Sequence, residues 1–343
     1  MEAVLEEGLV SLISPCYNVA KYLPRFFDSL LQQTYDRLHV ILIDDGSTDE
    51  TWDVIERYVP LLKARGYEVD TIRQSNQGQS VALQVGLQYV KGEFFSWPDP
   101  DDFLFPDSIS RRVAILRSQP DDVALVRCNA VCIREEDDAE IGYYMPAGQD
   151  VYVYDRFFRD VLLRKTFLGA MCCLAKTRSF LDINPAREIY TRKDAGQNWQ
   201  LLLPLGYHFR TVETSEVLCG YLVRSTSHSQ KMQSYEQRIA YENMCDTVVL
   251  ETLFRMGLAG SKWERQAHAL SVLHCYRIAC RCQRPQMAEE YLRELKTLGF
   301  SARCVARLYS LCAQWGKSHW NENPQSYLNR GLSWLGIACL PPY

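Results

Sequence analysis

Three carboxylates gather in one short turn of the sequence. Asp99, Asp101 and Asp102 come directly after the apolar run 94–97, and Pro100 separates the first two. Carboxylates this close repel one another unless a cation lies among them, and Mg²⁺ and Mn²⁺ prefer oxygen ligands that they often share with a diphosphate. The turn is therefore a candidate site for a metal that holds a phosphate. The same residues also fit a plain turn followed by a helix N-cap, an alternative that this segment alone leaves open.

Two other polar loops follow apolar runs in the same way. The runs 9–14 and 38–43 are typical of buried strands, and they are followed by the polar segments 15–18 and 44–49. Helical segments separate these strands, which predicts crossover units and a mainly parallel sheet. Ligands of such sheets bind beyond the carboxyl ends of the strands. We therefore expect the three polar loops to meet at one edge of the sheet.

The remaining periodicity divides the chain into two parts. Further strands are expected at 67–73, 92–97 and 123–129, helices at 19–33, 48–64, 79–90 and 196–205, and a loop at 134–150, while 174–180 and 212–223 flank the last of these helices. Beyond residue 230 helical segments follow one another at 234–256, 262–283, 285–298, 301–315 and 325–339, separated by Gly or Pro. We expect an α/β domain over residues 1–230 and a helical subdomain over residues 231–343.

Composition limits the classes of partner. With 343 residues and 47% hydrophobic residues the chain can bury a large core, and its net charge of −4 does not favour nucleic acid as a partner. The first residues are acidic and lack the pattern of a signal peptide, and no apolar run is long enough to span a bilayer. We expect a cytoplasmic protein.

The 13 cysteines are scattered through apolar segments, which is typical of reduced core residues in the cytosol. Cys275, Cys280 and Cys282 lie near His268 and His274, a combination that raises zinc binding as an alternative. These cysteines lack a paired Cys-x-x-Cys pattern and lie in helix-like sequence. We interpret them as core residues.

Five segments, in this order and spacing, resemble the motifs of family 2 glycosyltransferases, of the kind that build bacterial surface polysaccharides. The segments are 10–18, 29–35, 43–49, 76–80 with Gly86 and Leu87, and 99–102, and the resemblance covers roughly residues 8–230. It implies the GT-A fold, an α/β fold with a mainly parallel sheet flanked by helices. The C-terminal helical subdomain would follow it.

The resemblance also implies a role for each loop. Asp45 would accept the N–H of uracil, and the ring of Tyr17 would pack near the base. Asp99 would face the ribose and the metal, and Asp101 would bind the metal on the diphosphate. His228, in the late segment 221–229, would complete the metal shell. The other residues implied in nucleotide binding are Pro15, Asn18, Asn76, Ser80 and Arg224. The implied cofactor is Mn²⁺ or Mg²⁺.

One position departs from the pattern of the family. Many members carry Glu-Asp before the short helix that precedes the late segment, and this Asp is their general base. Here the corresponding residues are Gln197 and Asn198. An amide cannot take a proton at neutral pH, so Asn198 is expected to bind sugar or acceptor instead. Asp194 is the nearest carboxylate in the sequence and is the candidate base.

The implied activity is inverting transfer of a sugar from a nucleotide sugar, with UDP as the expected nucleotide, to a hydroxyl of a glycan or lipid-linked acceptor. Two alternatives stay open. The first is a non-catalytic protein of the same fold that binds a nucleotide sugar. The second is a sugar-phosphate nucleotidyltransferase, which would need a Gly-rich, Lys-bearing phosphate loop that is not found before Tyr17.

The C-terminal third has a distinct charge. Residues 231–343 carry a net charge of +5, from 14 Lys and Arg against 9 Asp and Glu. Leu328, Leu332, Leu335 and Cys339 fall on one helical face, with Trp334 nearby. This segment is expected to pack on the α/β domain or on a second subunit, as in a homo-oligomer. Peripheral contact with the inner face of the cell membrane is the alternative.

Overall fold

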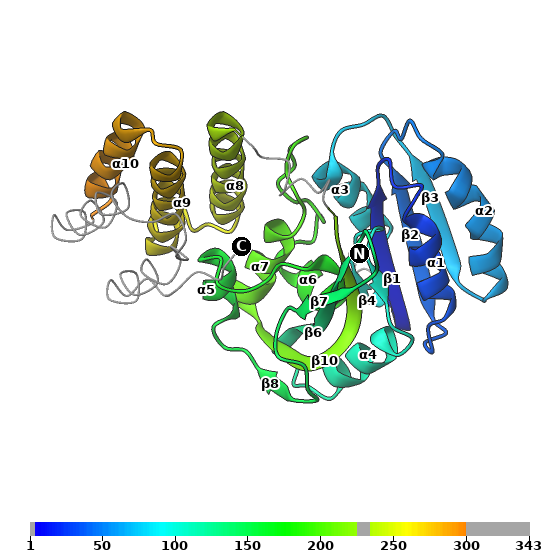
Figure 1. Ribbon diagram of the computed structural model, residues 1–343. Helices are drawn as coiled ribbons and strands as arrows, with labels where there is room; N and C mark the ends of the chain where they lie inside the picture. The colour runs from blue at the N-terminus through cyan, green and yellow to red at the C-terminus, as the bar shows by residue number, and fades with distance from the viewer. Residues whose placement is uncertain (1–3, 225–233, 300–343) are drawn as a thin grey trace. The chain divides into compact units, whose positions relative to one another are not determined.

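The computed structural model describes residues 4–224 and 234–299 (Figure 1). The chain forms two compact units, one of residues 1–158 and 168–227 and the other of residues 159–167 and 228–343. The segment 159–167 therefore belongs to the helical unit, although the sequence predicted it as part of the α/β domain. The predicted boundary at residue 230 lies within 225–233, outside the described residues.

The first unit is built on one sheet. Its strands are β1 (Glu6–Cys16), β2 (Leu38–Asp44), β3 (Glu68–Arg73), β4 (Gly92–Ser96), β5 (Phe103–Leu104), β6 (Val123–Arg134), β7 (Glu140–Tyr143), β8 (Val151–Val153), β9 (Cys173–Lys176) and β10 (Arg210–Val223). Their order is β3-β2-β1-β4-β9-β6-β10-β5, with β7 beside β6 and β8 beside β10. The α/β fold class predicted from the sequence is confirmed.

The half of the sheet that is formed by the first four strands in the sequence is parallel. Strands β3, β2, β1 and β4 all run in the same direction, with Leu12 opposite Val40 of β2 and Ser96 of β4. The side chains of Leu12, Ile13, Val40 and Ile41 are fully buried, because helices cover both faces of these strands. The strands β2 and β3 are added on one side of β1, whereas β4 lies on its other side. The order of the strands in the sheet therefore reverses between β1 and β4. A reversal of this kind opens a crevice at the carboxyl ends of the strands.

The other half of the sheet is mixed, unlike the mainly parallel sheet that we expected. β9 pairs antiparallel with both β4 and β6, and β5 pairs antiparallel with β10. The predicted loop at 134–150 contains β7, which pairs with β6. Because β9 is antiparallel to both of its neighbours, β6 runs in the same direction as β4, and β10 is parallel to β6. Residues that follow β10 therefore lie at the same edge as those that follow β1, β2 and β4.

Helices join the strands of this unit. They are α1 (Leu23–Leu31), α2 (Thr51–Ala64), α3 (Gln79–Tyr89), α4 (Ser108–Arg117), α6 (Thr177–Ile183) and α7 (Trp199–His208), with a short 3₁₀ helix at Ala170–Cys172. α5 (Phe157–Leu162) crosses from the first unit into the second. Most of the expected helices are shorter by a few residues in the structure, as helix ends commonly are.

The helical unit contains α8 (Tyr235–Arg255), α9 (Lys262–Arg281) and α10 (Pro285–Thr297), close to the predicted bounds. Ser234 begins α8 with a capping box formed with Gln237, and Ser261 caps α9. The helices predicted at 301–315 and 325–339, and with them the proposed membrane or subunit contact of the tail, lie outside the described residues. Across the parts of the chain that the structure describes, no helix is both long and apolar enough to cross a bilayer.

A buried ion pair joins α8 to the segment 159–167. Glu242 accepts a hydrogen bond of 2.5 Å from Arg164 and lies 3.4 Å from Nδ1 of His274. Burial by itself would raise the pKa of Glu242, but His274 and Arg164 together lower it to about 2. A carboxylate whose pKa falls on folding stabilises the fold above its unfolded pKa, and this contribution is lost as the pH falls from about 4.5 to 2.

We expect Glu242→Gln to lower the free energy of unfolding by about 3 kcal/mol at neutral pH, because it removes the negative charge that faces buried Arg164. Denaturant unfolding of the full chain measures this change. Glu236→Gln, on the same helix but 71% exposed, is the matched control and should change stability little. The gap between wild type and Glu242→Gln should close as the pH falls from about 4.5 to 2. A gap that persists at the acid end would contradict a charge effect.

Candidate active site

The three polar loops meet at one edge of the sheet, as the sequence predicted. The hydroxyl of Ser14 donates a 3.0 Å hydrogen bond to the carbonyl of Pro98, which ties the end of β1 to the carboxylate turn. Asn18 accepts from the backbone N–H of Thr48 at 2.8 Å, and its own N–H donates to the hydroxyl of Ser47. Asn18 adopts a left-handed backbone with φ of 51°, which asparagine tolerates better than most residues.

Asp99 lies at the centre of this edge. Its Oδ1 accepts hydrogen bonds from the side-chain amides of Gln79, at 2.8 Å, and Gln197, at 2.7 Å. Burial first, and then the charge of Asp101, raise the pKa of Asp99 to about 7. Among the described residues no hydrogen bond reaches Asp99 Oδ2, so this atom is available to a ligand.

Asp101 and Asp102 complete the carboxylate cluster. Asp101 forms an ion pair of 2.7 Å with Arg224, which follows β10. Asp102 is 2% exposed and accepts a 3.0 Å hydrogen bond from the backbone N–H of Leu222. Burial raises the pKa of both carboxyls, and for Asp102 the charges of Asp101 and Asp99 raise it further. Asp102 therefore holds the turn against β10.

The donor set of this cluster fits a hard divalent cation. Asp99, Asp101 and Asp102 share one turn, and the charge of Asp101 adds to the effect of burial in raising the pKa of Asp99 and Asp102, so a cation bound among them would relieve that repulsion. Their oxygens are the ligand type that Mg²⁺ and Mn²⁺ prefer. Arg224 is the cation that faces Asp101 in this structure. His228, the third predicted ligand, lies outside the described residues.

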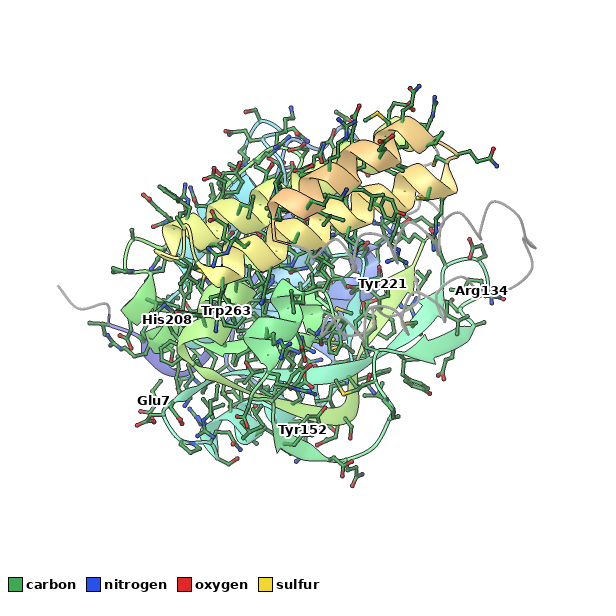
Figure 2. The ribbon with its side chains drawn as sticks, turned by 90° about the vertical axis from the view of Figure 1, so that its left-hand side faces the viewer. Glu7, Arg134, Tyr152, His208, Tyr221 and Trp263 are labelled. Atoms are coloured by element: carbon green, nitrogen blue, oxygen red, sulfur yellow. The ribbon has the colours of Figure 1, made fainter. Side chains whose placement is uncertain are left out.

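Aromatic rings flank the cluster. The guanidinium of Arg224 lies 4.9 Å from the ring centre of Tyr22, which also donates a hydrogen bond to Glu135. Tyr221 on β10, labelled in Figure 2, lies 5.4 Å from the ring of Tyr144. Burial and the neighbouring carboxylates raise the pKa of Tyr221 to about 12, so it is neutral and able to donate a hydrogen bond.

Asp45, the residue predicted to bind uracil, is buried and hydrogen-bonded within the protein. It is 2% exposed and accepts hydrogen bonds from the side chain of Gln74, at 2.7 Å, and from the N–H groups of Gln77, at 2.9 Å, and Gly78, at 2.8 Å. A carboxylate can accept about four hydrogen bonds, so one further bond is open to it. Asp45 holds the loop 74–78 in place and keeps capacity for one ligand donor.

The other residues predicted to bind the nucleotide differ in their exposure to solvent. Tyr17 is 48% exposed at the end of β1, so its ring is free to receive a base. Pro15 is buried in β1, opposite Ile43, and contributes backbone shape. Asn76 is partly exposed in the loop before α3. Ser80 is buried, and its hydroxyl both donates to the carbonyl of Arg192 and accepts from the N–H of the same residue.

Ser80 therefore joins α3 to the segment 192–197 and does not face the open edge. Its hydroxyl already donates one hydrogen bond and accepts another within the protein. The nucleotide role that the motif pattern implied for Ser80 stays a prediction. The pattern specifies a small polar residue at this position, but not the partner that the hydroxyl takes.

Gly78 is required where this loop crosses the same segment. Its φ is +97°, and a Cβ added there would lie 2.1 Å from the carbonyl oxygen of Lys193. We expect Gly78→Ala to lower the free energy of unfolding by about 2 kcal/mol or more, from backbone strain and the clash together. Gly66, with φ of +96° and no atom within 4 Å of an added Cβ, is the matched control. Thermal unfolding of Gly66→Ala reports strain alone, and equal losses in the two variants would contradict the clash.

The two candidate catalytic positions have different surroundings. Asp194 is 56% exposed, and both of its oxygens accept hydrogen bonds from Arg192. Asn198 accepts a 3.0 Å hydrogen bond from the indole N–H of buried Trp97. Asn198 therefore has a structural partner at the floor of the site, while Asp194 is accessible but held by a cation.

Several residues of this site were missed by the sequence reasoning. Gln79 lies directly beside the predicted Ser80, but its amide had no assigned role. Gln197 was recognised only as part of a departure from the family. Tyr22 and Tyr221 carry no local signal, since aromatic residues at such spacings are usually core. Only the meeting of Gln79 and Gln197 at Asp99 identifies them as one arrangement.

Comparisons with known proteins agree with this geometry. Residues 11–172 match the family model described as Glycosyl transferase family 2. An uncharacterised glycosyltransferase of Rickettsia prowazekii is 35% identical over 128 residues, which is 37% of this chain and 38% of the relative. The putative glycosyltransferase EpsH of Bacillus subtilis is 33% identical over 125 residues, 36% of this chain and 34% of the relative. The matched segment thus spans a little over a third of these relatives.

Solved structures share the fold over a longer stretch. Residues 1–349 of TarS from Staphylococcus aureus, in complex with UDP-GlcNAc, superpose with a TM-score of 0.54 at 16% identity, covering 88% of this chain and 91% of that one. The mannosyltransferase PcManGT from Pyrobaculum calidifontis, in complex with GDP-Man and Mn²⁺, has a TM-score of 0.53 at 18% identity, with 96% and 85% covered. Residues 11–172 of this chain are therefore similar to the family 2 glycosyltransferases, and its α/β unit shares the GT-A fold of these structures.

Proposed function

We propose that this protein is an inverting, metal-dependent glycosyltransferase that moves a sugar from a UDP sugar to an acceptor hydroxyl. The observation that carries the proposal is the cluster of buried Asp102 with partly buried Asp99 and Asp101 at the carboxyl edge of the sheet, with Arg224 against it. A nucleotide diphosphate brings negative charge and needs cations, and this edge offers an arginine and a set of oxygen ligands suited to a divalent ion.

The donor would bind along the loops that follow β1, β2 and β4. Exposed Tyr17 offers a ring face to the base, and Asp45 can accept one more hydrogen bond, as the N–H of uracil would supply. Asp99 and Asp101 would hold Mn²⁺ or Mg²⁺. The bound ion would offset the charge that develops on the departing diphosphate.

Arg224 has a second task in this scheme. Its guanidinium, which pairs with Asp101 at 2.7 Å, would also bind phosphate oxygens of the donor through two parallel N–H groups. The ring of Tyr22, 4.9 Å away, limits how far the guanidinium moves. The arginine thus offsets the charge of Asp101 and would contact the diphosphate of the donor.

The acceptor hydroxyl would attack the anomeric carbon from the face opposite the diphosphate. Asp194 is the proposed base, and it must leave Arg192 to take the proton. Asn198, held by Trp97, would orient sugar or acceptor through its remaining amide hydrogens. The proposed acceptor is a glycan or lipid-linked hydroxyl in the synthesis of a bacterial surface polysaccharide or glycoconjugate, on the cytoplasmic side of the membrane.

One observation favours a second candidate function. Both residues at the expected Glu-Asp position are amides, and Gln197 is committed to Asp99. A protein that binds a nucleotide sugar without transferring it would show this pattern. The donor site would then be retained, while no carboxylate would be positioned to take the acceptor proton.

Thermal unfolding with a panel of UDP, GDP and other nucleotide sugars, each with Mn²⁺, Mg²⁺ or EDTA, tests the proposal. A ligand present at 100 times its Kd should stabilise the fold by about 2.7 kcal/mol. We expect the largest stabilisation from a UDP sugar with metal. UDP release from that sugar then separates enzyme from binding protein. Stabilisation by no nucleotide sugar under any condition would refute both functions.

A further inference from the structure

Three cysteines from distant parts of the sequence meet in the core of the first unit. They are Cys128 on β6, Cys172 at the end of the 3₁₀ helix and Cys219 on β10, and their sulfurs all lie within 4.8 Å of one another. All three side chains are fully buried. Every cysteine in the described ranges is a free thiol, and this trio is the one group of three within them whose possible ligand atoms all lie within 4.8 Å of one another.

The sequence raised zinc binding as an alternative in a different place, in the helical unit. Within the described residues of that unit, no metal-binding cluster is formed by Cys275, Cys280, Cys282, His268 and His274. His268 contacts Asp246, and His274 contacts Glu242. The sequence places no paired motif around Cys128, Cys172 or Cys219, so only the pairing of β6 with β10 and the turn at Ala170–Cys172 brings them together.

A buried cation lies beside the three sulfurs. Arg112 on α4 is fully buried and donates hydrogen bonds to the carbonyls of Ser108, Met171 and Cys173 and to the hydroxyl of Ser108. None of these partners is charged, and no carboxylate of the described residues forms an ion pair with Arg112. The Ser108 hydroxyl lies 3.7 Å from Cys219 Sγ, and Cys219 Sγ lies 3.2 Å from the carbonyl oxygen of Met171.

Burying a guanidinium without a negative charge beside it costs desolvation free energy, so a group that can carry negative charge is expected nearby. The ionisable groups that act on Arg112 are the thiols of Cys128, Cys172 and Cys219 and that of Cys173. Burial raises the pKa of the Cys219 thiol, but Cys128, Cys172 and Arg112 together lower it well below its usual value. Burial raises the pKa of the Cys128 and Cys172 thiols well above the usual value, so the thiolate form, in which cysteine binds metal, is favoured at Cys219 alone while no ion is bound.

We propose that Cys128, Cys172 and Cys219 bind one Zn²⁺ ion, with Arg112 as the neighbouring positive charge that balances the site. Three thiolates around a divalent ion leave one negative charge, which matches the single charge of Arg112. The spacing agrees as well. Sulfurs bound tetrahedrally to zinc at about 2.3 Å lie about 3.8 Å apart, and here Cys128 and Cys219 are 3.4 Å apart with all three within 4.8 Å.

A zinc ion there would be structural. It would tie the paired strands β6 and β10 to the turn before β9, and Cys172 lies 44 residues from Cys128 and 47 from Cys219. Metal bound only by the folded chain adds its binding free energy to folding. The carboxylate cluster offers oxygen ligands only, so the chemistry of the two sites differs.

The test uses the full-length protein produced with zinc in the medium. Elemental analysis and native mass spectrometry should show one zinc per chain in the wild type and in Cys173→Ser. Cys173 is the matched control, because it is fully buried in the same turn while its sulfur contacts the carbonyl of Gly169. Cys219→Ser and Cys128→Ser should lose the zinc. Asp101→Ala should keep it, which separates this site from the carboxylate cluster.

A spectroscopic measurement on the wild type keeps the proposal open to refutation if the serine variants fail to fold. The protein, unfolded with a chelator and refolded with Co²⁺, should show the intense thiolate-to-cobalt charge transfer of sulfur ligation. Removal of zinc should also lower the Tm. Wild-type protein without zinc and without this absorption, zinc retained in Cys219→Ser, or a Cys128–Cys219 disulfide found by mass spectrometry would overturn the inference.

Discussion

Asp101→Ala is expected to abolish the Mn²⁺-dependent binding of UDP while leaving the fold intact. Asp101 is only 17% exposed and lies in a carboxylate cluster, where Arg224 is its one ion-pair partner among the described residues. Removing it takes away a proposed ligand of the metal that would contact the diphosphate. Calorimetry of UDP binding, with and without Mn²⁺, measures the effect. Unchanged metal-dependent affinity would refute the assignment of Asp101.

The ion pair calls for a control, because Asp101→Ala also releases Arg224. Arg224→Met removes the guanidinium and leaves the carboxylate in place. If Arg224 competes with the metal, this variant should bind Mn²⁺ alone more tightly than the wild type and should bind UDP more weakly, since a phosphate contact is lost. If Asp101 serves only to position Arg224, the two variants should behave alike, and Mn²⁺ binding by itself should change in neither.

The second large effect concerns the proton of the acceptor. Asp194→Asn should lower turnover by roughly 10²-fold or more if Asp194 is the general base, with little change in donor affinity. Steady-state rates of UDP release at saturating donor measure this. Arg192→Met is the useful control, because it frees the Asp194 carboxylate from its partner and should not reduce turnover in the same way. Full activity of Asp194→Asn would exclude this residue.

Asn198 gives a complementary test. Asn198→Asp restores a carboxylate at the position where many family members have one, and its oxygen can still accept from the indole of Trp97. A rise in turnover would mean that the protein has lost a base at this position. Asn198→Ala should instead weaken binding of sugar or acceptor. If neither the wild type nor Asn198→Asp has measurable turnover while UDP-sugar binding persists, the non-catalytic alternative is the better description.

Local sequence was sufficient to predict the frame of the site. The strands ending at Cys16, Asp44 and Ser96 are short apolar runs, and the helices between them force a parallel arrangement. Parallel strands present their carboxyl ends at one edge, so the loops around Asn18, Asp45 and Asp99 had to meet. These predictions depend on periodicity and chain direction, which are properties of each segment and its neighbours.

The partners of the side chains were decided by the tertiary structure. Arg224 reaches Asp101 across 123 residues, and Gln197 reaches Asp99 across 98. Such contacts depend on the insertion of antiparallel β9, which sets the direction of β10. Nothing in the periodicity of either segment specifies that pairing.

The same holds for Ser80 and for the three core cysteines. Ser80 hydrogen-bonds the backbone of Arg192, although its sequence context suggested a ligand contact. Cys128, Cys172 and Cys219 are each ordinary apolar positions in their own strands or turn, and they form a cluster only because three elements pack at one point. Sequence patterns report which residues are buried and which way a strand runs. Which buried groups touch is settled by packing across the whole sheet, since each contact depends on the positions of several elements at once.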